Sequence, residues 1–252
     1  MSGHSKWANI KHRKSAQDAK RGQLFSKLAK EITVAAKMGG GNPENNVRLR
    51  VAIERAREAN MPTENIERAI KRGTGELEGA TYEEVVYEGY GPGGVAILVN
   101  VLTDNKNRTA AEIRKIFSKF GGSLGTSGSV AWIFEKKGYI SVDANKYSED
   151  EMLEIAIEAG ADDVKKEGDV ISIYTSVESF SDVLNALRTK GIEIKVSEIS
   201  MIPKTTATLD DETAIKVLKL LEELENNDDV QNVSSNLDAS DAVFERFSRE
   251  AA

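Results

Sequence analysis

The chain has 252 residues, 40% of them apolar and 30% charged, a composition that suits two or three compact domains and argues against wholesale disorder. It contains no cysteine, which excludes disulfides, thiolate metal sites and cysteine nucleophiles. No run approaches the roughly 18 apolar residues of a membrane span, and the N-terminus lacks the apolar segment of a secretory signal. We therefore expect a cytoplasmic protein whose first residues belong to the mature chain.

Charge is distributed unevenly along the sequence. The first thirty residues hold eight Lys or Arg and a single acidic residue, Asp18. Residues 1–75 carry a surplus of nine positive charges and the remaining residues a deficit of sixteen, which together give the net charge of −7. A concentrated basic segment attracts polyanions whatever the net charge of the chain.

Residues 1–75 have a helical pattern. One apolar stripe recurs at helical spacing and ends at three glycines: Leu24, Phe25, Leu28 and Ile32, before Gly39–Gly41. Ser15 and Asp18 have the spacing of a capping box ahead of it. Asn42 and Pro43 predict the start of a second helix, as its N-cap and first residue. A short third helix is expected to stop at Gly73.

After Gly75 the pattern changes to strands mixed with helices. The expected elements are strands at 85–87 and 95–99, a helix over 108–120, strands starting at 130 and 140, a helix over 149–159, strands near 164 and over 170–174, a helix over 178–189, a strand over 192–199, a helix over 211–225 and a strand over 230–233. From Tyr139 the order is βαββαβ, which is the ferredoxin-like arrangement. Pro203 is expected in a linker that leads out of this unit.

We therefore predict an α+β protein of three domains. A basic helical, nucleic-acid-binding domain covers residues 1–78. Two ferredoxin-like α/β domains follow, one inserted in the other: residues 79–137 with 202–252 form the outer domain, and residues 138–201 form the inserted one.

The basic side chains of the first domain are the candidate nucleic-acid contacts. Up to Lys14 the chain has little apolar content and is interpreted as a flexible arm whose Trp7, His4 and His12 stack on bases. Lysines of the first helix lie opposite its apolar stripe, and arginines flank both sides of the second stripe. The candidates are Lys6, Trp7, Lys11, His12, Arg13, Lys14, Lys20, Lys27, Lys30, Lys37, Arg48, Arg50, Arg55 and Arg57. The alternative is a solvated helical hairpin with snorkelling lysines.

Catalytic and metal sites are not indicated. The two histidines lie on the predicted arm, with no further ligands nearby for a closed zinc site. We therefore expect no enzyme activity, no cofactor and no metal.

The Gly121–Ser129 segment matches no phosphate-loop spacing; a flexible connector is favoured over a loop whose amides bind an anion. In the segment from Thr103 to Thr109, Asn and Asp are interpreted as helix caps.

Three segments resemble the YebC/PmpR family of bacterial regulators, whose mitochondrial relative is a translational activator of cytochrome c oxidase. They are GHSKWANIKHRK, LTDNKNRTAAEIRKIF and GGSLGTSGSVAWIFEKKG. The resemblance covers essentially the whole chain. It implies a helical domain followed by two α/β domains, one inserted in the other, in agreement with the order of elements above.

The resemblance implies two roles. One is DNA-bound control of transcription, and the other is assistance to ribosomes, through ribosomal RNA, at difficult stretches such as consecutive prolines. We expect the first, with ribosome-linked control of translation as its close rival. The acidic α/β domains then serve as spacers and as surfaces for protein partners. A third hypothesis is that these domains bind a small ligand that switches the helical domain.

Overall fold

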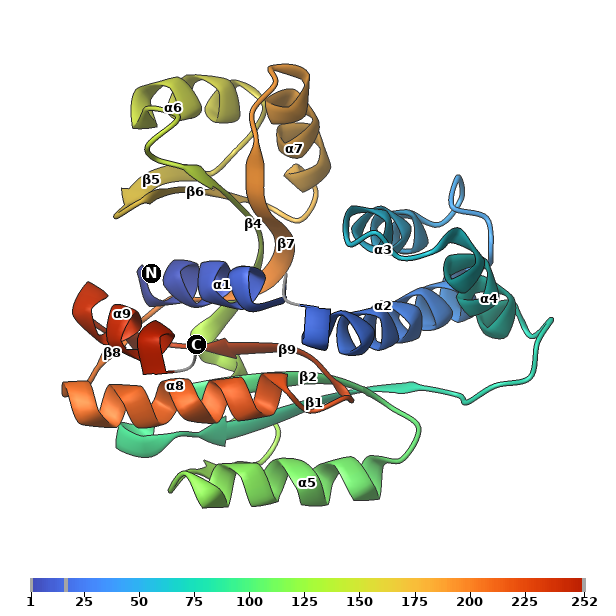
Figure 1. The fold of residues 1–252 in the computed structure, drawn as a ribbon, viewed down its shortest axis with the longest axis horizontal. Coiled ribbons are helices and arrows are strands. Elements are labelled where there is room, and N and C mark those ends of the chain that lie inside the picture. Colours follow the sequence, from blue (N-terminus) through green and yellow to red (C-terminus); the bar gives the residue numbers. More distant parts are fainter. Residues whose placement is uncertain (1, 16–17, 251–252) are drawn as a thin grey trace.

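The computed structural model describes residues 2–15 and 18–250, with side chains at 3–11 and 21–250. A helical part is followed by two four-stranded antiparallel sheets, which confirms the mixed α/β class and the helical N-terminal region (Figure 1). In the described part of the chain, no helix combines the length and apolar character needed to cross a bilayer.

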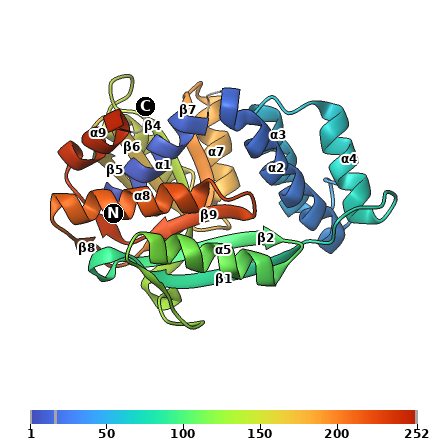
Figure 2. The same ribbon diagram turned by 60° about the horizontal axis from the view of Figure 1, so that its bottom comes forward.

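Three helices form the helical unit, which lies to one side of the sheets (Figure 2): α2 (Asp18–Gly39), α3 (Val47–Glu58) and α4 (Thr63–Thr74). Its core contains the predicted stripes, with Ile32 of α2 and Leu49 of α3 fully buried. The predicted N-cap at Asn42 is wrong. Asn46 caps α3 instead, accepting a hydrogen bond from Leu49 N at 3.1 Å.

The ends of the other predicted helices of this unit need smaller changes. Helix α4 runs one residue beyond Gly73 and is capped by Gly75, whose φ of 84° favours glycine. The capping box expected between Ser15 and Asp18 lies outside the residues whose side chains are described.

The sheet nearest the top of Figure 1 has the strand order β5-β6-β4-β7, which is the ferredoxin-like order. Its elements are β4 (Phe134–Asp143), α6 (Glu149–Glu158), β5 (Asp163–Glu167), β6 (Val170–Thr175), α7 (Phe180–Thr189) and β7 (Ile194–Pro203). One face packs against both helices, where Ile140 and Ile173 meet Met152 and Leu187. The other face presents Tyr139 and Tyr174 to the middle of the molecule.

The second sheet has the order β3-β1-β2-β9. Its strands are β1 (Glu83–Tyr90), β2 (Ala96–Thr103), β3 (Ser123–Leu124) and β9 (Val230–Ser235); its helices are α5 (Lys106–Lys119), α8 (Asp211–Glu225) and α9 (Asp241–Glu250). Short 3₁₀ turns cover Pro92–Gly94 and Ala131–Ile133, and β8 (Ala207–Thr208) pairs with β10 (Leu237–Asp238). Phe117 of α5, Leu218 of α8 and Phe247 of α9 share one core. The sequence interpretation missed α9.

The long strands β4 and β7 run continuously between the two sheets. They pair along their whole length, from Phe134 opposite Pro203 to Val142 opposite Ile194. The predicted boundaries at 137/138 and 201/202 therefore fall inside paired strands. Pro203 is not in a linker but is the last residue of β7, and the strand expected from Val130 begins only at Phe134, after a 3₁₀ turn.

Residues 2–15 do not form the expected arm. They form helix α1 (Ser2–Ser15), which crosses the middle of the molecule between the two sheets (Figure 1). Trp7 is only 8% exposed and packs against Phe247 with ring centroids 6.1 Å apart. His4 Nε2 lies 3.1 Å from Ser200 Oγ, and burial lowers the pKa of His4 to about 4. In this structure neither ring is available to stack on a base.

Trp7→Ala is expected to lower the free energy of unfolding by about 3 to 5 kcal/mol, because a large buried side chain leaves a cavity. The matched control is Trp132→Ala, since Trp132 is 67% exposed; its effect should stay within about 0.5 kcal/mol. Chemical denaturation measures both. Equal stabilities for the two variants would restore the arm interpretation.

Candidate nucleic-acid interface

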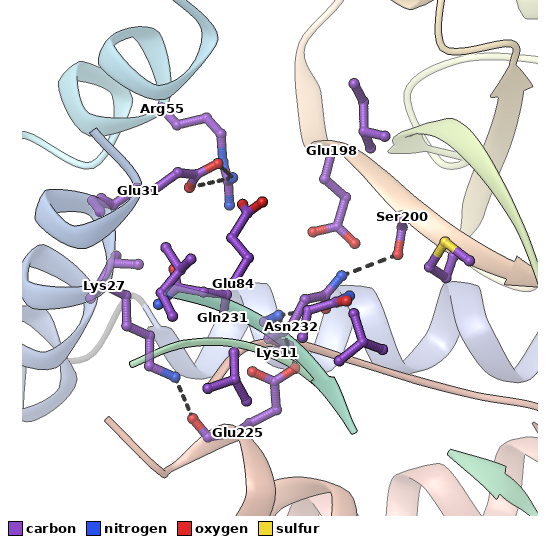
Figure 3. A pocket seen from close by; sticks show the side chains of 18 of the residues that line it. Lys11, Lys27, Glu31, Arg55, Glu84, Glu198, Ser200, Glu225, Gln231 and Asn232 are labelled. Carbon is purple, nitrogen blue, oxygen red and sulfur yellow. Dashed lines mark hydrogen bonds and ion pairs between the residues drawn. The ribbon is translucent and has the colours of Figure 1, made fainter. Parts of the chain in front are cut away.

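A cavity of about 470 Å³ lies between the helical unit and the sheets (Figure 3). Helices α1, α2 and α3 supply most of its basic residues, and β4 adds Lys136. Strands β1, β2, β7 and β9 with helix α8 supply most of the rest. Five of the predicted nucleic-acid contacts line it: Trp7, Lys11, Lys27, Arg48 and Arg55. The cavity is where the basic and the acidic parts of the chain meet.

The two lysines that α1 and α2 contribute to this cavity are held by Glu225, at the end of α8. Lys11 Nζ lies 2.9 Å from Glu225 Oε1 and donates to Asn232 Oδ1 at 3.1 Å. Lys27 Nζ donates to the backbone oxygen of Glu225 at 2.6 Å. Burial lowers the pKa of Lys27 to about 8, whereas for Lys11 the charges of Glu225 and Glu198 outweigh burial and raise the pKa. Their donors are directed inward.

The two arginines of the cavity are also paired with carboxylates. Arg55 Nη1 lies 2.9 Å from Glu31 Oε2 and 3.2 Å from Oε1, on the neighbouring helix α2. Arg48 forms an ion pair with Glu84 of β1, so it joins the helical unit to the second sheet. Each guanidinium therefore already contacts an anionic oxygen group, which is what a phosphate would offer it.

Asp229, just before β9, anchors α2 most firmly. Its side chain is 7% exposed, and Lys30 Nζ lies 2.7 Å from Oδ1. Its Oδ2 accepts from Arg108 Nη2 at 2.8 Å and from Thr109 Oγ1 at 2.6 Å. Burial alone would raise the pKa of Asp229, but these hydrogen bonds hold it well below its usual range. Helices α2 and α5 thus share one buried carboxylate.

Lys6 is likewise engaged inside the molecule. It forms an ion pair with Asp241 at the start of α9, and its Nζ lies 5.4 Å from the ring centroid of Phe244. The side chains of His12, Arg13, Lys14 and Lys20 lie outside those that the structure describes.

The remaining candidates lie on the outer surface of the helical unit. Lys37, Arg50 and Arg57 are exposed, and within the described part of the chain no ion pair engages them. Arg50 and Arg57 are seven residues apart and flank the buried stripe of α3 on the side away from Arg48 and Arg55. The structure therefore divides the four arginines into a cavity pair and an outer pair.

Three exposed cations of α4 were missed by the sequence interpretation: Arg68, Lys71 and Arg72. The sequence could have indicated them, because they lie in the last two turns of a helix whose apolar face is formed only by Ile66, Ala69 and Ile70, so the cations must lie on its polar face. Exposed glutamates share this surface, at Glu54 on α3 and at Glu64 and Glu67 on α4. The outer surface therefore offers single arginines and lysines for phosphate contact rather than a uniformly positive field.

Comparisons with known proteins cover nearly the whole chain. Residues 5–76 match the model of the TACO1/YebC protein N-terminal domain, and residues 82–237 match that of the TACO1/YebC second and third domain. A probable transcriptional regulatory protein of Dictyoglomus turgidum is 61% identical over 98% of this chain and all of its own length. One from Treponema denticola is 59% identical over 94% of this chain and 96% of its own.

The fold also matches a solved structure. The crystal structure of a conserved hypothetical protein from Aquifex aeolicus is 55% identical and has a TM-score of 0.81, covering 89% of this chain and 93% of that one.

Asp229→Asn is expected to lower the free energy of unfolding by about 3 kcal/mol, because it leaves Lys30 and Arg108 without their buried counter-charge. The exposed pair of Lys119 and Glu223 supplies the control: Glu223→Gln should cost less than about 1 kcal/mol. Because the pKa of Asp229 is lowered in the folded state, the ionised carboxylate contributes to the free energy of unfolding at neutral pH, and this contribution is lost in acid. Denaturation curves of wild type and Asp229→Asn should converge as the pH falls; a difference independent of pH would contradict this role.

Proposed function

The chain belongs to the TACO1/YebC family, and on this premise we propose that it is a regulator of gene expression that contacts nucleic acid through the outer surface of α2, α3 and α4. The names of its relatives support a regulator of transcription. The observation that carries the proposal is the division of the α3 arginines. Arg48 and Arg55 are paired with carboxylates, whereas Arg50 and Arg57 are exposed and have no ion pair among the residues that the structure describes. Their planar forks suit phosphate.

The proposed contacts are made to the backbone rather than to bases. Arginine and lysine side chains bind phosphate oxygens and set the position of a nucleic acid, whereas sequence is read by side chains that reach base edges. The α/β part of the chain is strongly acidic, so a polyanion is repelled from most of it. We propose that the helical unit meets the phosphate backbone of a duplex, in the cytoplasm, while the acidic part is available to protein partners.

DNA is the first target that we propose, since the relatives are named for transcription. Ribosomal RNA is the second candidate. Backbone contacts without a set of base-reading residues suit RNA as well as duplex DNA. Binding of a small ligand has less support, because Lys11 and Arg55, which line the cavity, are already paired with carboxylates.

Arg50→Ala with Arg57→Ala is expected to weaken binding to a random-sequence DNA duplex and to reduce the slope of log K against log salt by about 2, one unit for each lost phosphate contact. The matched control removes the cavity pair, Arg48→Ala with Arg55→Ala, which takes the same charge from the same helix. Fluorescence anisotropy at several salt concentrations measures both. Equal loss of binding in the two double variants would contradict an outward-facing interface.

The two targets are separated by a second measurement. Co-sedimentation with ribosomes at a salt concentration that already releases random DNA would favour RNA. A defined operator bound much more tightly than random DNA would favour transcription. In either case the Arg50→Ala/Arg57→Ala variant should reduce the binding, since both targets present phosphates.

A further inference from the structure

Two aromatic side chains at the far end of β1 are exposed yet fixed in place. Trp132 is 67% exposed, and its Nε1 donates to the backbone oxygen of Ser129 at 3.0 Å. Tyr90 is 37% exposed, and its hydroxyl donates to the same oxygen at 3.1 Å. One carbonyl therefore tethers both rings, so the exposed Tyr90–Trp132 pair is held close together.

The loop that carries Trp132 is built around a buried carboxylate. Glu88 of β1 accepts hydrogen bonds from the backbone nitrogens of Gly128 at 2.6 Å, Val130 at 2.8 Å and Ala131 at 2.8 Å. Its own carbonyl accepts from Gly125 N at 2.8 Å. Burial would raise the pKa of Glu88, but the three amides lower it, which keeps the group ionised at neutral pH. The segment expected to be a flexible connector is thus an ordered loop. The anion that its amides bind is the carboxylate of Glu88 in the same chain.

The segment that leads to Trp132 carries no charge, and the first carboxylate after it is that of the exposed Glu135. Residues 120–134 contain no charged side chain, and Thr126 and Ser127 of the loop are exposed. The nearest chain segment adds a cation. Lys204 is exposed, and its backbone nitrogen donates to the carbonyl of Ile133 at 2.8 Å.

We propose that Tyr90 and Trp132 form a stacking platform for unpaired bases of a single-stranded nucleic-acid segment, with Lys204 close to its backbone. The inference rests on the proposed function, since it takes nucleic acid as the partner, and it adds a contact remote from the helical unit. Exposed, rigid aromatic rings bind bases without sequence preference, because every base has a flat face. The glycine and hydroxyl residues beside them let a sugar–phosphate chain approach closely.

A protein partner is less well supported by the same surface. The core of a protein interface is a continuous apolar patch around its aromatic anchors. Here Ala131 and Ile133, which flank Trp132, are half-buried and pack inward, while the exposed loop beside them is Gly, Ser and Thr. The platform is two isolated rings rather than the centre of such a patch.

Intrinsic tryptophan fluorescence tests the platform in the full-length chain, because Trp7 is buried and Trp132 is exposed. The probes are an eight-nucleotide oligoadenylate, as RNA and as DNA, and a random DNA duplex. We expect both single strands to quench the fluorescence. Because the variants at Trp132 lack this exposed reporter, their affinities are measured by fluorescence anisotropy of an end-labelled oligoadenylate. Trp132→Ala should lower affinity for both single strands by about 5- to 100-fold, while Trp132→Phe retains most of it. Lys204→Ala should reduce the salt slope by about 0.7.

The control is Leu153→Ala on α6, which removes another exposed apolar side chain and should leave binding unchanged. Absence of quenching by either single strand, or unchanged affinity in Trp132→Ala, would overturn the platform and leave these rings for a protein partner. Duplex binding should depend on Arg50 and Arg57 but not on Trp132. If single-strand binding depends on Trp132 while duplex binding does not depend on Arg50 and Arg57, the stacking platform is supported and the proposed interface on the helical unit is contradicted.

Discussion

The docking of the basic N-terminal helices onto the acidic remainder of the chain is the interaction on which the arrangement of the molecule depends. Glu225 holds Lys11 and Lys27, and Asp229 holds Lys30. Helix α1 fills the space between the two sheets, where Trp7 joins the core of the second sheet. Several of the basic residues in the first 75 positions are therefore paired with carboxylates of the acidic remainder, inside one molecule.

This docking decides which cations remain for a partner. A lysine whose ammonium is buried against a carboxylate would have to give up that pairing before it could bind phosphate, and leaving the carboxylate unpaired costs free energy. The outer arginines of α3, Arg50 and Arg57, can bind phosphate without first breaking an ion pair of the described residues. The Tyr90–Trp132 platform is prepared in a different way, because the ionised Glu88 is stabilised by hydrogen bonds from backbone amides, while the two rings reach the surface. The molecule thus offers phosphate contacts at one end and flat aromatic faces at another.

Local patterns predicted the elements well where one face is apolar and the other polar. The stripe ending at Ile32, the strand around Val99 and the helix 211–225 all lie where periodicity places them. Helix α1 could not be found this way, because it has few apolar residues and buries His4 and Ser5 with them. Its hydrogen-bond partners on strands lie 130 to 221 residues later, Ser200 among them. The pairing of Glu88 with amides 40 residues away is equally invisible in sequence.

Hydrogen exchange of the backbone amides in α1 tests the central claim most directly. We expect residues 3–11 of the free protein to exchange as slowly as the buried strand β2, at low salt and without nucleic acid, since this helix is enclosed by both sheets. Addition of nucleic acid should leave that protection unchanged. Fast exchange of α1 in the free protein, with protection gained only on binding nucleic acid, would contradict the account and return these residues to the role of a flexible basic arm.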